Sequence, residues 1–277
     1  MISGKTQLIA HLGYPTEAFK APMIYNPWFE KHAIDAVVMP MGVKPQDYPA
    51  ALAALARVTN LRGALVTMPH KVTTLALADE VTKTARIAGA CNALLRRADG
   101  SLLGDQFDGA GFVRGALRKG CVIDGARALV VGAGGVGCAI AASLAAEGAA
   151  EIALSDPNQA AADALRGRLR DHYPNLVVTI GSNDPTGHDI VVNATPLGMN
   201  EGDALPFDVE RLAPNAFVGE VVMKAEVTPL LRAAKARGCR VQVGTDMLFE
   251  MIPAYLEFFG FGTATPDELR EVSTISY

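Results

Sequence analysis

The sequence predicts an α/β protein with two domains, each built around a mostly parallel sheet. Three observations support this fold class. Short β-type runs alternate with helical patterns along nearly all of the 277 residues. The stretch VVGAGGVGCAI joins an apolar run to an alanine-rich helical pattern through glycines, which is typical of a dinucleotide-binding unit. Hydrophobic residues make up 50% of the chain, enough to fill sizeable cores.

The first third of the chain contains the elements expected for one α/β domain. Two apolar runs flank Ala98-Asp99-Gly100 and indicate a β-hairpin, which predicts one antiparallel strand in an otherwise parallel sheet. The remaining elements come before this hairpin. They are strands at 6–13, 36–43 and 63–68, and helices at 23–33 and 48–59.

The rest of the chain continues as β/α units. We expect a helix at 108–121, the glycine-turn unit, strands at 175–180, 189–194, 216–223 and 240–244, and helices at 228–238 and 246–261. Pro253 predicts a kink in the last of these helices. We place boundaries near residues 110 and 244. Residues 1–110, joined by the C-terminal helices of 245–277, form the predicted substrate-binding and catalytic domain, and 111–244 form the dinucleotide-binding domain.

Charge and cysteine content exclude several classes of partner. A net charge of −4 gives no broad basic field for nucleic acid or an anionic membrane. No apolar run approaches the roughly 18 to 20 residues that a membrane span needs, and the N-terminus lacks a signal-peptide pattern. The four cysteines and five histidines show no metal-ligand spacing. We therefore expect a cytoplasmic protein that binds a small molecule and no metal.

The glycine turn predicts a dinucleotide site. Its glycines permit a tight turn and bring the backbone close to a pyrophosphate at the helix N-terminus. Asp156 closes the next strand, where a carboxylate accepts hydrogen bonds from ribose hydroxyls and repels a 2′-phosphate. We therefore expect NAD, with NADP less favoured unless a distant arginine compensates. The turn itself consists of Gly132, Ala133, Gly134, Gly135, Val136 and Gly137.

Three polar residues at strand ends form a candidate catalytic set: Lys71, Asn92 and Asp108. A general acid or base needs a titratable group with a partner that orients it, and strand ends are where such groups meet in α/β proteins. Each residue alone also has a structural explanation: a solvated charge at a helix start, a turn residue and an N-cap, respectively. His70 titrates near neutrality but has no partner in a motif, so we rank it below Lys71.

Seven segments, in order, resemble the motifs of the shikimate dehydrogenases. The resemblance covers nearly the whole chain. It implies a two-domain enzyme, with its active site in the cleft, that transfers hydride reversibly between a nicotinamide cofactor and the C3 oxygen of shikimate or a related acid such as quinate. The segments are VTMPHK, ARIAGACNALL, GDQFDGAGF, GAGGVGCAI, NATPLGM, VTPLLRAAKARG and GTDMLFEM.

The resemblance also implies roles for individual residues. Lys71 corresponds to the proton shuttle of the family and Asp108 to its partner, while Thr67 and Asn92 correspond to contacts with substrate hydroxyls. Four further residues would border the cofactor phosphates and the nicotinamide. These are Thr195, Met199, Gly244 and Met247.

The sequence departs from the family where the substrate is recognised. Phe19 and Ala21 replace the two serines that hold the substrate carboxylate, and Met251 replaces a glutamine. Losing such hydrogen bonds costs roughly 1 to 3 kcal/mol each, so unmodified shikimate is expected to bind weakly. Lys20, or another cation such as Lys224, is a candidate for a replacement contact. The NADP-type N-R-T of the family is SDP here, which agrees with the expectation of NAD.

Our leading hypothesis is an NAD-preferring oxidoreductase of the shikimate dehydrogenase type, as a monomer or homodimer. The alternative is an NAD-binding sensor or regulatory protein whose substrate pocket has decayed, which the apolar residues Phe19, Leu65 and Met251 would suit. The presence of both Lys71 and Asp108 opposes that alternative. A folate-type dehydrogenase/cyclohydrolase shares the two-domain plan, but NATPLGM and GDQFDG argue against it.

Overall fold

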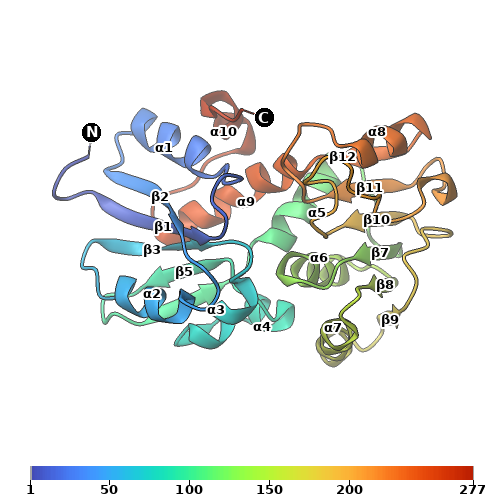
Figure 1. Cartoon of the computed structure of the whole chain (residues 1–277), viewed down its shortest axis with the longest axis horizontal. Coiled ribbons are helices and arrows are strands. Elements are labelled where there is room, and N and C mark those ends of the chain that lie inside the picture. Colours follow the sequence, from blue (N-terminus) through green and yellow to red (C-terminus); the bar gives the residue numbers. More distant parts are fainter. Residues whose placement is uncertain (1, 277) are drawn as a thin grey trace. The chain divides into compact units, whose positions relative to one another are not determined.

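The computed structural model describes residues 2–276 and divides into two compact units (Figure 1). Unit 1 comprises the chain up to Phe107 together with Met251–Ser276, and unit 2 comprises Asp108–Glu250. Each unit contains one six-stranded sheet. The predicted fold class, α/β with two mostly parallel sheets, is confirmed.

The sheet of unit 1 has the strand order β2-β1-β3-β5-β6-β4. Strand β5 runs antiparallel to both of its neighbours, and the other pairs are parallel. The hairpin predicted from Ala98-Asp99-Gly100 therefore supplies the antiparallel strand. The strands are β1 (Gln7–Gly13), β2 (Ala36–Gly42), β3 (Leu61–Val66), β4 (Glu80–Val81), β5 (Ala93–Arg96) and β6 (Leu102–Asp105).

Helices cover both faces of this sheet. The chain moves outward from β1 to β2 and then back past β1 to β3, so right-handed crossovers put α1 (Pro22–Lys31) and α2 (Tyr48–Leu55) on opposite faces, as Figure 1 shows. Beneath α2, apolar side chains of β1 and β3 form a buried cluster with Tyr48 and Leu52. Three shorter helices complete the unit: α3 (Lys71–Leu77), α4 (Lys83–Ala88) and α10 (Pro266–Val272).

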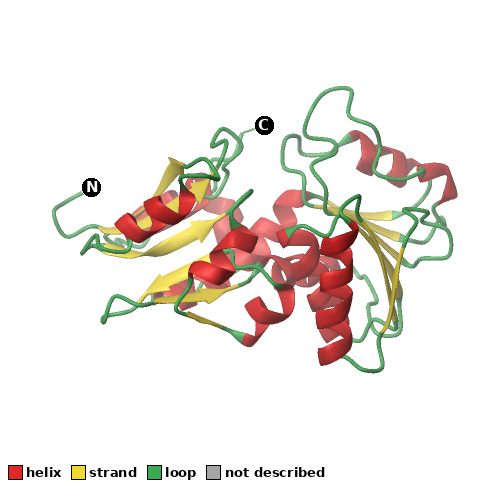
Figure 2. Ribbon diagram, turned by 60° about the horizontal axis from the view of Figure 1, so that its bottom comes forward, coloured by secondary structure: helices red, strands yellow, loops and turns green. Residues whose placement is uncertain are grey.

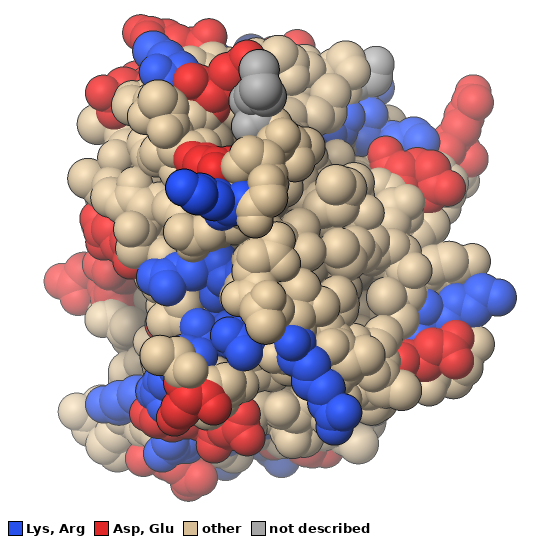
Figure 3. All heavy atoms as spheres, turned by 90° about the vertical axis from the view of Figure 1, so that its left-hand side faces the viewer, with Lys and Arg blue, Asp and Glu red and all other residues tan. Residues whose placement is uncertain are grey.

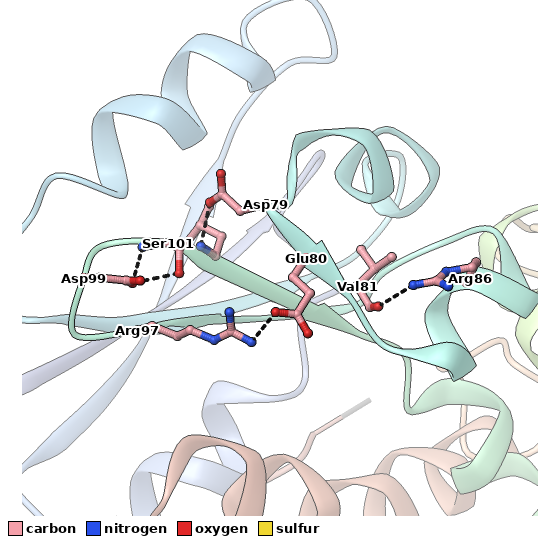
Figure 4. A network of polar contacts seen from close by, with 8 residues as sticks. Asp79, Glu80, Val81, Arg86, Arg97, Asp99 and Ser101 are labelled. Carbon is pink, nitrogen blue, oxygen red and sulfur yellow. Dashed lines mark hydrogen bonds and ion pairs between the residues drawn. The ribbon is translucent and has the colours of Figure 1, made fainter.

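Polar contacts fasten the β5–β6 hairpin to β4 (Figure 4). Asp99 closes the turn by accepting from the Ser101 backbone nitrogen at 3.0 Å and from its hydroxyl at 2.7 Å. An Arg97–Glu80 ion pair of 2.7 Å joins β4 to the turn that follows β5. Because both ionic side chains are partly exposed, this pair contributes only about 0–1 kcal/mol. The backbone pairing of the strands is therefore the larger constraint on the hairpin.

The sheet of unit 2 is parallel throughout, with the order β12-β11-β10-β7-β8-β9. The chain enters at β7, runs outward to β9, and then returns to β10 on the other side of β7. The carboxyl ends of β7 and β10 thus flank the point where strand order reverses, which is where α/β sheets bind ligands. The strands are β7 (Arg127–Val131), β8 (Glu151–Ser155), β9 (Val177–Ile180), β10 (Ile190–Asn193), β11 (Phe217–Glu220) and β12 (Arg240–Gln242).

Helices also cover both faces of the second sheet, as Figures 1 and 2 show. Helices α6 (Gly135–Ala146) and α7 (Gln159–His172) lie on one face and α8 (Pro229–Ala236) on the other. The unit also contains α5 (Asp108–Arg118) and a short 3₁₀ helix, η1 (Val209–Arg211). Helix α9 (Gly244–Phe259) begins in unit 2, and the boundary with unit 1 falls between its residues Glu250 and Met251.

The surface carries mixed charge. On the face that Figure 3 shows, basic and acidic side chains are interspersed, with neutral residues between these groups. Among residues 2–276, no helix has the length and apolar character required to cross a membrane. Over the same residues, no group of three or more His, Cys, Asp or Glu side chains is arranged to hold a metal ion.

The close contact between α5 and α6 predicts how a substitution at Gly109 changes stability. A Cβ at Gly109 would lie 2.0 Å from the carbonyl oxygen of Ala139, so the helices would have to move apart. We expect Gly109→Ala to lower the free energy of unfolding by about 2–4 kcal/mol in urea titrations. The control is Gly167→Ala in α7, where a Cβ meets nothing within 4 Å and should add about 0.5–1 kcal/mol of stability. Equal stabilities of the two variants would contradict this account.

Candidate active site

The turn between β7 and α6 has the geometry of a phosphate cradle. Gly132 adopts φ 107°, a conformation that side chains disfavour. A Cβ at Gly137 would lie 1.9 Å from the carbonyl oxygen of Gly132, so this helix–turn contact also requires glycine. At Gly134, by contrast, a Cβ would meet nothing within 4 Å. Gly134 therefore borders open space at the start of α6, and the first turn of this helix holds no acidic residue.

The carboxylate of Asp156 stabilises this turn. One of its oxygens accepts from the Ala133 backbone nitrogen at 2.6 Å, and the other accepts from the Asn158 backbone nitrogen at 2.7 Å. The end of β8 is thus tied to the glycine turn of β7. A cation also lies close by, because Nη2 of Arg168 on α7 is 3.6 Å from Sγ of Cys138 in α6.

The loop after β10 lies beside the same turn. A Cβ at Gly132 would lie 2.8 Å from the Ala194 carbonyl oxygen and 3.1 Å from Cγ2 of Thr195. The Asn193 side chain fixes this loop by accepting from the Thr195 hydroxyl at 2.7 Å and donating to the Leu197 carbonyl oxygen at 3.0 Å. The structure therefore brings the glycine turn and Thr195 together at the switch point of unit 2.

The other predicted cofactor residues lie farther along unit 2. Met199 follows the same loop and is partly buried. Gly244 begins α9, where a Cβ would lie 2.3 Å from the carbonyl oxygen of Val222. Met247 is one turn on and is buried. Gly244 thus lets the start of α9 approach the backbone just after β11.

In unit 1, Lys71 begins α3 directly after the carboxyl end of β3. Its side chain is buried, with a relative exposure of only 8% for the residue. The Lys71 carbonyl oxygen accepts from the Cys91 backbone nitrogen at 2.9 Å, which ties the helix start to the segment leading into β5. A lysine that serves only as a solvated charge at a helix start would be exposed. The burial of Lys71 therefore argues against that explanation.

Asn92 makes hydrogen bonds to several neighbouring segments of unit 1. Its carbonyl oxygen accepts from the Val66 nitrogen at 2.7 Å and from the Tyr255 hydroxyl at 2.9 Å. Its side-chain Oδ1 accepts from the Phe107 nitrogen at 2.9 Å. Its Nδ2 is buried and has no hydrogen-bond partner among the described residues. Because an unmade buried hydrogen bond costs about 1–3 kcal/mol, this donor points to a ligand.

Asp108 is the first residue of unit 2 and of α5, and it is almost fully buried. It directly follows Phe107, whose backbone nitrogen Asn92 holds in unit 1. The Asn92 side chain therefore fixes the chain immediately before Asp108.

His11 is a site residue that sequence reasoning missed. It lies in β1, and its Nδ1 has no hydrogen-bond partner among the described residues. Burial, and then the charge of Lys71, lower the pKa of His11 to about 3. The ring stacks on Phe19, with centroids 4.1 Å apart and planes 28° apart. His11 is thus a neutral imidazole at physiological pH, close enough to Lys71 to feel its charge.

Phe19 also reaches the ends of β1 and β3. A Cβ built on Gly13 would lie 2.7 Å from Cζ of Phe19 and 2.4 Å from Cγ2 of Thr67. Thr67 itself is half-buried, and its backbone nitrogen donates to the Leu12 carbonyl oxygen at 2.8 Å. The structure therefore brings Phe19, Thr67 and His11 together at one end of the sheet.

The remaining substrate-binding candidates lie around α1 and α9. Ala21 is the buried N-cap of α1 and makes no side-chain cap. The Lys20 ammonium donates to the backbone carbonyl oxygen of Ser276, near the C-terminus. Met251 is half-buried at the start of the α9 segment that belongs to unit 1.

His70, ranked below Lys71, is packed into the core. Its ring stacks on Tyr48 at 3.9 Å with planes 3° apart, and Nε2 pairs with the Val43 carbonyl oxygen at 2.8 Å. Burial lowers the pKa of His70, although the bond to Val43 raises it in part. These contacts assign His70 a structural role.

One surface hollow of unit 2 lies away from the glycine turn. Cys121, Asp124, Asp189 and Arg240 are among its lining residues, next to the amino ends of β7, β10 and β12. Ligands of α/β sheets bind at the carboxyl ends, so this hollow has no part in the candidate site.

Sequence relatives decide the family. A family model described as shikimate dehydrogenase substrate binding domain matches residues 12–94. Shikimate dehydrogenase (NADP(+)) of Acidiphilium cryptum (strain JF-5) is 35% identical over 270 residues, which cover 97% of this chain and 96% of that protein. The enzyme of the same name from Rubrobacter xylanophilus is 37% identical, covering 89% and 88%.

The chain belongs to the shikimate dehydrogenase family.

Solved structures with similar folds agree with this result. Shikimate 5-dehydrogenase from Listeria monocytogenes, in complex with shikimate and NAD, has a TM-score of 0.86 and 27% identity, covering 98% of this chain and 97% of that one. Quinate dehydrogenase from Corynebacterium glutamicum, in complex with NAD, also reaches 0.86 and 27%, covering 96% and 98%. The 5-ketofructose reductase of Gluconobacter sp. strain CHM43 reaches 0.83 and 26%, covering 98% of each chain. The similar folds therefore carry names with different substrates.

The expected preference for NAD over NADP is wrong. Curated relatives of the family, 33–37% identical to this chain, are named as NADP(+) enzymes, although NAD is bound in two of the similar structures. The error lay in the role given to Asp156. Its carboxylate bonds two backbone nitrogens and stabilises the turn, so its presence does not specify the cofactor. The Arg168 guanidinium lies 3.6 Å from Sγ of Cys138 in α6, a contact that the sequence pattern did not reveal.

The buried His11 predicts how the stability of the protein depends on pH. Below about pH 6.5 the unfolded chain protonates this histidine, whereas the folded protein does so only near pH 3, so stability falls as pH decreases through this window. We expect His11 to account for a loss of about 2 kcal/mol between about pH 7 and about pH 5. Urea unfolding of His11→Phe should lack this part of the pH dependence. Equal pH dependence in the two proteins would contradict the burial of a neutral imidazole.

Proposed function

We propose that the protein is an NADP-dependent oxidoreductase acting on the C3 hydroxyl of shikimate or a related polyhydroxylated ring compound. The observation that carries this proposal is the buried Lys71, whose charge acts on His11 and whose carbonyl oxygen is bonded to Cys91, the residue before the unpartnered Asn92 donor. The glycine turn at the switch point of unit 2 supports it independently. Membership of the shikimate dehydrogenase family supports the class of reaction.

The residues of unit 2 fit a dinucleotide. Gly134 leaves room for a pyrophosphate at the N-terminus of α6, whose backbone nitrogens and dipole attract negative charge. Thr195 lies beside this turn, and Arg168 brings positive charge to the first turns of the helix. When bound, the cofactor supplies the hydride acceptor or donor. Met199, Gly244 and Met247 are the proposed contacts nearer the nicotinamide.

The residues of unit 1 are proposed to orient the substrate and move the proton. The Lys71 ammonium donates a proton to the carbonyl oxygen in reduction, and the neutral amine accepts it from the hydroxyl in oxidation. Asp108 is proposed to orient and charge-balance Lys71. Nδ2 of Asn92 and the hydroxyl of Thr67 would hold neighbouring substrate hydroxyls. The hydrogen bonds that Asn92 makes with Phe107, Tyr255 and Val66 hold its side chain in place.

Replacement of Lys71 tests the catalytic assignment. We expect Lys71→Ala to lower kcat by about 10²- to 10⁴-fold with a smaller effect on KM, because methyl cannot move a proton. The matched control is Lys83→Ala, since Lys83 also begins a helix but is exposed. NADPH formation should be followed with shikimate, quinate and derivatives in which the carboxylate is modified. Unchanged turnover in Lys71→Ala would remove Lys71 from the mechanism.

Replacement of Gly134 tests the cofactor site. A Cβ at this position meets no protein atom, so Gly134→Ala should fold normally but weaken NADP⁺ binding at least tenfold in calorimetry. Gly137→Ala is the contrasting variant, because its Cβ collides with the turn and should destabilise the protein itself. Equal NADP⁺ affinity in Gly134→Ala and the parent would contradict the proposed cradle.

The same measurements separate the enzyme from a sensor. A sensor would bind NADP⁺ yet show no turnover with any compound of a broad hydroxy-acid and polyol panel. Such a result would favour a regulatory protein derived from the family over the enzyme proposed above.

A further inference from the structure

We propose that the substrate is recognised without a carboxylate, so that the site selects a neutral polyhydroxylated ring alcohol or its ketone. This inference rests on the proposed function, because it concerns the substrate of the same site in unit 1. It differs from the family resemblance, which implies an acid held by two serine hydroxyls.

The first observation is the surface that replaces those hydroxyls. Phe19 stacks on His11 and reaches Gly13 and Thr67, so an aromatic ring covers the ends of β1 and β3 next to the start of α3. Ala21 adds only a buried methyl group. A carboxylate against this surface would lose its hydration and gain no hydrogen bond, which is strongly unfavourable.

The second observation is the state of the nearby basic groups. The Lys20 ammonium donates to the Ser276 backbone carbonyl oxygen, so it is directed to the C-terminal segment. His11 is neutral because burial and Lys71 lower its pKa to about 3. Lys71 is the proposed proton carrier, and its ammonium therefore belongs to the reacting oxygen. Neither His11 nor Lys71 is therefore left to balance a substrate carboxylate, and the Lys20 ammonium is bonded to the C-terminal segment.

The third observation is what the site does offer. Nδ1 of His11 and Nδ2 of Asn92 are buried and have no hydrogen-bond partner within residues 2–276. A neutral imidazole and an amide suit hydroxyl groups, which both donate and accept. An aromatic ring such as that of Phe19 suits the apolar C–H side of a polyol ring. Together these groups form a site for a ligand with hydroxyls on one edge and no charge.

A matched pair of substrates tests the inference in the unmodified protein. Initial rates of NADPH formation would be compared for shikimate and its methyl ester, which keeps the reacting hydroxyl and masks only the charge. We expect kcat/KM to be at least tenfold higher for the ester. A kcat/KM for the acid that equals or exceeds that of the ester overturns the inference and leaves the proposed function standing.

Restoring the two hydroxyls provides the complementary test. In the double variant Phe19→Ser and Ala21→Ser, we expect kcat/KM for shikimate to rise at least tenfold while that for the ester does not rise. A gain that is the same for both compounds overturns the inference. The comparison in the parent protein stands even where this variant fails to fold.

The failure of the proposed function has a different signature. The panel would also contain quinate, methyl quinate and myo-inositol with NADP⁺, and 2-keto-myo-inositol with NADPH. Absence of turnover for every compound overturns the proposed function, and the inference with it. Turnover of the acids with the esters and inositols inactive overturns the inference alone.

Discussion

The unit 1 site depends on the hydrogen bonds of one residue, Asn92. Its backbone joins the end of β3 to the β5–β6 hairpin and to the Tyr255 hydroxyl of α9, and its side chain holds the Phe107 nitrogen. These bonds use the acceptors of Asn92 and leave Nδ2 as a buried donor. Since Oδ1 must face Phe107 to accept, the orientation of the amide is fixed by the protein. One residue therefore both assembles the strand ends and supplies a contact for a ligand.

Much of the fold was predictable because its elements are long and periodic. The alternating β and α patterns gave both sheets, and Ala98-Asp99-Gly100 gave the antiparallel strand. The short helix α4 was not predicted, and the bounds of α3 and α10 were not, since six or seven residues are too few to show a helical period. Their starts depend on local caps, such as the Thr82 hydroxyl at α4, and on tertiary contacts.

The site was predictable only in part, for a related reason. The order of the motifs identified Lys71, Asn92 and the glycine turn. Sequence spacing could not show which other residues lie close to them in the folded chain. His11 reads as one residue of an apolar strand, and only the folded chain brings it within reach of the charge of Lys71. The cofactor prediction failed similarly, because a sequence shows a carboxylate after β8 but not the two backbone nitrogens that it binds.

Reaction and recognition thus use separate parts of the unit 1 site. Lys71 and Asn92 match the motifs of the family, whereas Phe19 and Ala21 present apolar surface where hydroxyls are expected. The central claim is that Nδ2 of Asn92 serves the substrate while Oδ1 serves the fold. Asn92→Asp keeps the acceptor and removes the donor, so the ratio of kcat/KM in this variant to that in the parent tests the claim most directly. The account predicts a fall of at least 100-fold with the Phe107 contact retained. A kcat/KM within twofold of the parent would contradict it.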